Sequence, residues 1–134
     1  MPLDDDYNTW IVGQYRYPLD AYSWEIPEGG GKKNIDTIES AKRELLEETG
    51  IKATTWIKIQ EMHLSNSATD EFAVIYIVRN LSFHESSPEE SEQLVVKKIC
   101  FDDLYQMVKK GEITDSLTVA AVLKAKLMMA EGEL

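Results

Sequence analysis

The sequence has one cysteine, few basic residues and no long hydrophobic run, and each shortage excludes a class of protein. The single cysteine, Cys100, allows no internal disulfide and fits a reducing compartment, so we expect a cytoplasmic protein. The longest apolar run, Phe72 to Val78, is far shorter than the roughly 20 residues that a membrane-spanning helix needs. Residues 1–6 are acidic and lack the basic and then apolar order of a signal peptide. We therefore expect no association with a membrane.

Basic residues are outnumbered, with 14 lysines and arginines against 24 acidic residues and a formal net charge of −10. Such a surface repels the phosphates of nucleic acids unless a local basic patch overrides it. Two lysine pairs, at 32–33 and 109–110, are isolated in the sequence and form no such patch. We therefore expect no nucleic-acid polymer as a partner. A small phosphorylated ligand is compatible with this charge if metal ions offset it.

The apolar pattern predicts four or five strands and three helices in an irregular order. The expected strands cover residues 9–17, 22–26, 52–64, 72–78 and 93–101, and the expected helices cover 37–49, 101–109 and 115–129. The continuous apolar run at 72–78 predicts a central strand buried on both faces. No repeat or linker divides the chain, so we expect one domain over residues 1–134. The order indicates an α+β fold or an α/β sandwich.

The helix expected at 37–49 carries three glutamates on one face. Asp36 is a good N-cap residue, and Gly50 suits the left-handed residue that ends a helix. At about 100° per residue, Glu44, Glu47 and Glu48 converge on one side of this helix. Carboxylates this close repel one another unless something neutralises them, and Mg²⁺ does so through oxygen ligands. The alternative is an ordinary solvated helix face, which is common among Glu-rich helices.

The wider spacing favours the metal site over the solvated face. Three glycines at 29–31 precede the helix and would let the backbone approach a ligand closely. Gly29, thirteen further residues and the segment 43–51 (RELLEETGI) resemble the Nudix box, G-x5-E-x7-R-E-U-x-E-E-x-G-U with U aliphatic. All defined positions match except the first glutamate, where this chain has Ile35. In the family that glutamate supports the loop, so its replacement affects the rigidity of the loop and leaves the metal-binding face intact.

Further segments resemble the ADP-ribose pyrophosphatases of the Nudix family: residues 14–18 (QYRYP), 24–29 (WEIPEG) and 111–115 (GEITD). The resemblance implies the Nudix fold, an α/β/α sandwich whose mixed central sheet is flanked by helices. It implies hydrolysis, dependent on Mg²⁺ or Mn²⁺, of the pyrophosphate bond of a nucleoside diphosphate sugar. The expected substrate is ADP-ribose, and the products are AMP and ribose 5-phosphate. A homodimer is also implied, in which a partner would cover an open edge of the first strand.

The resemblance assigns the metal ligands residue by residue. Glu44, Glu47, Glu48 and the backbone carbonyl of Glu28 would hold the ions, and Glu48 is also an expected catalytic residue. Arg43 would act in catalysis by orienting these glutamates through ion pairs. Arginine suits this role because its guanidinium is always charged.

The resemblance also implies a substrate-binding set formed by Arg16, Glu25 and Gly30. Arg16 would bind a substrate phosphate, since a guanidinium can donate two parallel hydrogen bonds to one anion. The expected general base is Glu92, which immediately precedes the strand expected at 93–101. The other candidates for this role are Glu89, Glu90 and Glu71.

Two departures from the ADP-ribose pyrophosphatases leave the substrate open. The turn at 65–67 reads Ser-Asn-Ser where the family often has Ser-Pro-Gly, and the chain is expected to lack the N-terminal extension that helps to bind adenine. The base would then rest on Trp10, Tyr22 or Trp24, or be weakly recognised. The alternatives are therefore a Nudix hydrolase of a nucleoside triphosphate or dinucleoside polyphosphate, and a Nudix-fold module that binds a nucleotide without cleaving it.

Overall fold

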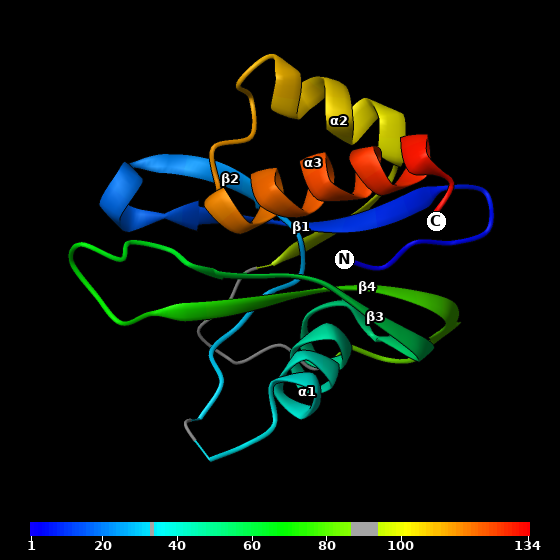
Figure 1. Cartoon of the computed structure of the whole chain (residues 1–134), viewed down its shortest axis with the longest axis horizontal. Coiled ribbons are helices and arrows are strands. Elements are labelled where there is room, and N and C mark those ends of the chain that lie inside the picture. Colours follow the sequence, from blue (N-terminus) through cyan, green and yellow to red (C-terminus); the bar gives the residue numbers. More distant parts are fainter. Residues whose placement is uncertain (33, 87–93) are drawn as a thin grey trace.

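The computed structural model of the chain describes residues 1–32, 34–86 and 94–134 (Figure 1). Its elements, in chain order, are β1 (Asn8–Arg16), the 3-10 turn η1 (Tyr17–Leu19), β2 (Ala21–Glu25), α1 (Thr37–Thr49), β3 (Ile51–His63), β4 (Phe72–Phe83), β5 (Val95–Cys100), α2 (Phe101–Lys109) and α3 (Ser116–Glu131). The α+β class expected from the sequence is confirmed. No helix of the described residues is long and apolar enough to span a membrane.

The strands form two antiparallel sheets, one in the order β2-β1-β5 and the other formed by β3 and β4. A short parallel bridge joins residues 1–3 to β4, with the Leu3 N–H donating to the Val78 carbonyl at 2.9 Å. The single mixed sheet that we expected therefore takes the form of two antiparallel sheets and one parallel bridge, because the parallel pairing extends over only a few residues. The prediction of an open edge on the first strand is wrong, since β1 lies between β2 and β5.

Alternating side chains divide the core into two layers, as the expected sandwich requires. Ile11 of β1 and Ile77 of β4 are fully buried in a cluster that also contains residues of α2 and α3. Their neighbours Trp10 and Val78 point the other way and pack with Leu45 of α1. Figure 1 shows α2 and α3 on one side of the strands and α1 on the other. Successive residues of a strand face opposite sides, so one run of apolar residues serves both layers.

The strand β4 is longer and more exposed than the sequence predicted. It extends to Phe83 because the polar residues after Val78 continue to pair with β3, up to the partners Phe83 and Ile51. Its first residue, Phe72, is half exposed, so the strand is not buried on both faces along its length.

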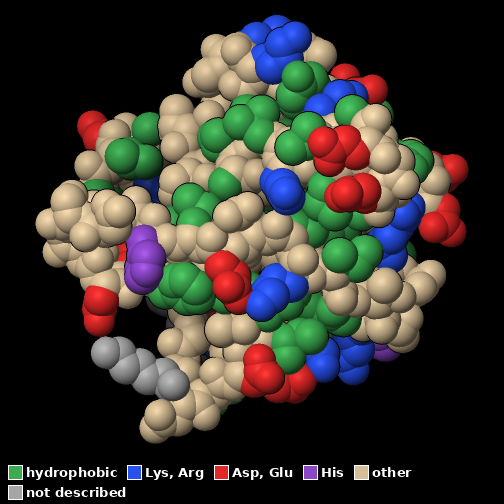
Figure 2. All heavy atoms as spheres, viewed as in Figure 1, with side chains coloured by type: hydrophobic (Ala, Val, Ile, Leu, Met, Phe, Trp, Pro, Cys, Tyr) green, Lys and Arg blue, Asp and Glu red, His purple; other side chains and the backbone are tan. Residues whose placement is uncertain are grey.

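One face of the molecule mixes both signs of charge. On this face, drawn in Figure 2, the lysine and arginine side chains of the described residues are interspersed with acidic and apolar ones.

Candidate active site

The ends of α1 fix the orientation of its glutamates. The Asp36 carboxylate accepts a hydrogen bond from the Ile38 N–H at 3.1 Å and so caps the start of the helix. Gly50 ends it with φ of 70°, and a Cβ there would lie 2.2 Å from the His84 carbonyl oxygen. Both conditions require glycine at this position. Leu45 anchors the helix in the core, which leaves the glutamate face turned toward the loop that follows β2.

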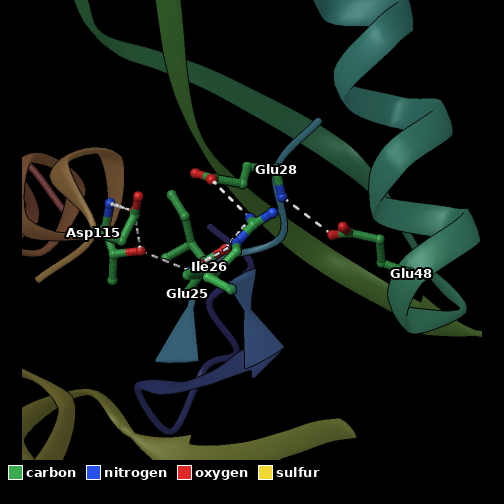
Figure 3. Close-up of polar contacts among 7 residues, drawn as sticks. Glu25, Ile26, Glu28, Glu48 and Asp115 are labelled. Atoms are coloured by element: carbon green, nitrogen blue, oxygen red, sulfur yellow. Dashed lines mark hydrogen bonds and ion pairs between the residues drawn. The ribbon is translucent and has the colours of Figure 1, made fainter. Parts of the chain in front are cut away.

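Glu48 is 5% exposed and is bound to the backbone of that loop. Its carboxylate accepts a hydrogen bond from the Glu28 N–H at 3.1 Å (Figure 3). A buried carboxylate needs such donors, because burial without them is costly. Glu48 therefore joins α1 to the turn at residues 25–29, which we call the catalytic turn because the sequence resemblance places an expected metal ligand, the Glu28 carbonyl, in it.

Gly29 is the glycine of the loop that the geometry requires. A Cβ at this position would lie 2.1 Å from Cδ of Glu44, so the Glu44 carboxylate packs directly on the Gly29 backbone. A Cβ at Gly30 would meet nothing within 4 Å. Gly30 instead contributes its carbonyl oxygen, which accepts a hydrogen bond from Arg43 at 3.3 Å.

Arg43 forms ion pairs with both Glu44 and Glu47. These pairs neutralise carboxylates that would otherwise repel one another on the helix face. The charge of Glu44 is the largest cause of the raised pKa of Arg43, which thus stays protonated. Arg43 thereby ties two of the expected metal ligands to the glycine loop.

Arg16 and Glu25 form a two-point ion pair on the other side of the catalytic turn. The Arg16 Nε donates to Glu25 Oε1 at 2.9 Å, and its Nη2 contacts the other carboxylate oxygen. Glu25 is 2% exposed, and burial is the largest single influence on its pKa and would raise it. The hydrogen bonds from Arg16, Ser23 and Gln14 and the positive charge of Arg16 together outweigh burial and lower the pKa. The Arg16 side chain remains 39% exposed at a cavity of about 320 Å³ next to the start of α3. Arg16 is thus held rigidly and is still accessible to a ligand.

The side chain of Glu28 lies among other carboxylates (Figure 3). Its Oε1 is 3.8 Å from Arg16 Nη2, and its buried Oε2 has no hydrogen-bond partner among the described residues. Burial raises the pKa of Glu28 to about 8, with further contributions from the charges of Asp115 and Glu25. From the sequence we expected a role only for the carbonyl of this residue and missed its side chain.

The residues of this region fit a hard divalent cation. The donors are carboxylate and carbonyl oxygens, which Mg²⁺ and Mn²⁺ prefer, and the buried Glu28 Oε2 has no hydrogen-bond partner among the described residues. As the side chains stand, no three acidic, histidine or cysteine residues of the described chain converge as a metal site. In this arrangement Glu44 and Glu47 are both paired with Arg43.

A second and larger cavity adjoins the same loop. Its volume is about 610 Å³, within the range of small-molecule sites. It lies between α1, the glycine loop and β4, and its lining includes Gly29, Glu44, Ile35, Trp56 and Tyr76. Ile35, the residue that departs from the Nudix box, is 48% exposed at this cavity.

The three aromatic residues that were candidates to hold a base differ in how exposed they are. Trp10 is 9% exposed and packs against Phe83 in the core. Tyr22 is half exposed, and its ring lies edge-on to Trp24 with centroids 5.4 Å apart. Tyr22 is therefore the accessible member of the three.

The candidates for the general base are placed unequally. Glu92, together with Glu89 and Glu90, lies outside the described residues. Glu71 is described and exposed just before β4, where its N–H donates to Thr69.

Comparison with known proteins agrees with this geometry. Residues 2–121 match the family model described as NUDIX domain. The chain is 30% identical over 132 residues to an ADP-ribose pyrophosphatase of Bacillus subtilis, covering 97% of this chain and 71% of that protein. A methanol dehydrogenase activator of Bacillus methanolicus is 34% identical, with 90% and 66% covered. An ADP-ribose pyrophosphatase of Mycobacterium tuberculosis is 29% identical, with 90% and 60% covered.

A solved structure shares the fold. The crystal structure of an ADP compounds hydrolase superposes with a TM-score of 0.85 at 18% identity, covering 99% of this chain and 72% of that one. The family match extends over most of the chain and includes α1, the catalytic turn and the strands that hold them. The chain therefore belongs to the Nudix family and is an enzyme of the Nudix pyrophosphohydrolase type.

Proposed function

We propose that this enzyme hydrolyses the pyrophosphate bond of a nucleoside diphosphate sugar, with ADP-ribose as its substrate. The observation that carries the reaction type is the catalytic turn, where the Glu28 N–H meets the Glu48 carboxylate and Gly29 supports Glu44. The choice of ADP-ribose is supported by the two relatives that bear the name ADP-ribose pyrophosphatase.

The metal ions of the proposal are Mg²⁺ or Mn²⁺. Glu44, Glu47, Glu48 and the carbonyl of Glu28 would hold them. Bound ions of this kind offset the charge of a pyrophosphate and lower the pKa of a water molecule. Arg43 would position the glutamates, since it already contacts two of them and the loop carbonyl of Gly30.

The substrate would lie across the catalytic turn. Arg16 would donate to a phosphate, with Glu25 holding its guanidinium in place from behind. Gly30 leaves open space beside its backbone for a ligand. The two cavities on either side of the turn have room for the groups attached to the pyrophosphate.

The reaction is an addition of water across the anhydride. A water oxygen bonds to one phosphorus while the bond from that phosphorus to the bridging oxygen breaks. The bridging oxygen leaves on the second phosphate, so ADP-ribose and water give AMP and ribose 5-phosphate. A carboxylate accepts the proton of the water, and we assign this role to Glu92 from its place in the sequence.

A substrate panel tests the proposal. The protein is incubated with ADP-ribose, GDP-mannose, UDP-glucose and deoxynucleoside triphosphates, with Mg²⁺ or with EDTA, and the products are identified by mass spectrometry. We expect AMP and ribose 5-phosphate from ADP-ribose with Mg²⁺ alone. Cleavage of another member of the panel would keep the chemistry and refute the substrate. Binding of ADP-ribose without cleavage of any compound would favour a binding module.

A homodimer and a cytoplasmic location stay predictions from the sequence. For the dimer, size-exclusion chromatography with light scattering should give twice the chain mass of 15.3 kDa. A particle of 15 kDa would refute it.

A further inference from the structure

Two backbone N–H groups of the catalytic turn are each bound by a side chain from a different helix. After β2 ends at Glu25, the next three residues are Ile26, Pro27 and Glu28. Proline has no N–H, so among these three residues only Ile26 and Glu28 carry a backbone donor. The Glu28 N–H goes to Glu48 of α1 at 3.1 Å, and the Ile26 N–H goes to Oγ1 of Thr118 in α3 at 2.9 Å. Buried donors of this kind need a partner.

Thr118 is itself held by Asp115, the N-cap residue of α3. The Asp115 carboxylate oxygen Oδ2 accepts from both the Thr118 N–H and the Thr118 O–H, each at 2.7 Å. The hydroxyl has one proton, which it gives to Asp115, so its lone pairs face the Ile26 N–H. Thr118 is fully buried, and so is most of Ile26, which is 4% exposed. Figure 3 shows this chain of hydrogen bonds leading from Asp115 to the turn.

The hydroxyl is not needed to cap the helix. The bond from the Thr118 N–H to Asp115 already satisfies the cap, and any residue at position 118 could make it. The side chain of Thr118 therefore has a separate partner, the Ile26 N–H, which lies 92 residues away in the sequence.

We propose that Thr118, oriented by Asp115, is a positioning residue for the catalytic turn. It fixes the backbone of Ile26, two residues before the carbonyl of Glu28 that the proposed function assigns to the metal, so this inference rests on that function. Groups behind the direct ligands commonly set metal affinity in this way, and their loss costs about 10- to 100-fold.

The test compares Thr118→Val, which removes the hydroxyl at nearly constant volume, with Thr118→Ser, which keeps it. Val122→Ala is the matched control, because Val122 is fully buried in the same helix and its apolar side chain cannot accept a hydrogen bond from the turn's N–H groups. The first measurement is residue-resolved amide hydrogen exchange by NMR, and the second is Mn²⁺ binding by electron paramagnetic resonance. Neither depends on hydrolytic activity.

We expect Thr118→Val to speed exchange of the Ile26 amide at least tenfold and to weaken Mn²⁺ binding at least fivefold. Thr118→Ser should stay within twofold of the wild type in both. Val122→Ala should lower the melting temperature while Mn²⁺ affinity stays within twofold. An unchanged Mn²⁺ affinity in folded Thr118→Val, or an equal loss in Val122→Ala, would overturn the proposal.

A measurement on the unmodified protein covers the case in which Thr118→Val does not fold. Adding Mg²⁺ should slow exchange of the Ile26 and Glu28 amides together, because one turn carries both. Slowing of the Glu28 amide alone would overturn the coupling. Absence of ADP-ribose cleavage with these exchange effects present would instead refute the proposed substrate and leave the positioning role intact.

Discussion

Glu28 should make the metal-free protein lose stability as the pH rises, and replacement by glutamine should remove that loss. The pKa of Glu28 is raised from 4.5 to about 8, chiefly because the carboxyl is buried and because Asp115 lies near it. Between these two values the folded protein keeps a proton on Glu28 that the unfolded chain has lost. The stabilisation is therefore fully present below pH 4.5 and disappears as the pH rises through about 8.

The size of the effect follows from the proton count. One proton that only the folded state binds changes the free energy of unfolding by about 1.4 kcal/mol per pH unit. From pH 5.5 to pH 7.5 the contribution of Glu28 therefore falls by about 3 kcal/mol. Glutamine has nearly the shape of the protonated carboxyl and does not titrate in this range. The stability of Glu28→Gln relative to the wild type should thus rise by about 3 kcal/mol over the same interval.

Urea unfolding in EDTA, followed by tryptophan fluorescence at several pH values, measures this difference. Glu131→Gln is the control, since Glu131 is an exposed residue near the end of α3, and its difference from the wild type should stay flat. Asp115→Asn should lower the pH at which the Glu28 effect ends, because it removes a nearby negative charge and keeps an oxygen for the helix cap. If the free energies of unfolding of the wild type and Glu28→Gln changed in parallel with pH, Glu28 would be ionised in the folded protein and the reasoning would be refuted.

Three further predictions concern the metal and substrate contacts. Gly29→Ala should lower kcat/KM at least tenfold because its Cβ would displace the Glu44 carboxylate; an unchanged kcat/KM in steady-state assays would contradict this. Glu48→Gln should reduce turnover at least about 100-fold, because an amide binds metal poorly. Its circular dichroism spectrum should be unchanged, because the amide oxygen can still accept the hydrogen bond from the Glu28 N–H. Arg16→Lys should raise KM for ADP-ribose more than it lowers kcat, because lysine cannot form the two-point pair, and an unchanged KM would remove the residue from the substrate site.

Local signals in the sequence are enough to predict α1 and the side of it that carries the glutamates. Asp36 and Gly50 set the ends of the helix at the predicted residues, and the glutamate spacing places the carboxylates beside the loop. These features depend on residues within a few turns of one another. The glycines at 29–31 were expected to let the backbone approach a ligand, and the structure places the Glu44 carboxylate against the Gly29 backbone, a contact that we did not predict from the sequence.

Contacts between distant segments lie beyond such reasoning. The bond between Ile26 and Thr118 joins residues 92 apart, and neither residue type signals a polar contact to the other. The raised pKa of Glu28 depends on burial and on Asp115, which only the folded chain brings near. The extension of β4 beyond Val78 has the same origin, because pairing with β3 outweighs the polar character of its last residues.

The catalytic turn is intact although Ile35 stands where the Nudix box has its first glutamate, because none of the hydrogen bonds that hold the turn involves residue 35. The turn is held at Glu25, Ile26 and Glu28 by side chains from β1, α3 and α1. None of these contacts involves Ile35, whose N–H bonds only to the Lys32 carbonyl within the loop. Ile35 contributes an apolar side chain to the wall of the large cavity, and the hydrogen bonds that hold the turn do not depend on it. We therefore expect substitutions at position 35 to change which group the cavity accepts, and substitutions at the three anchors to change turnover.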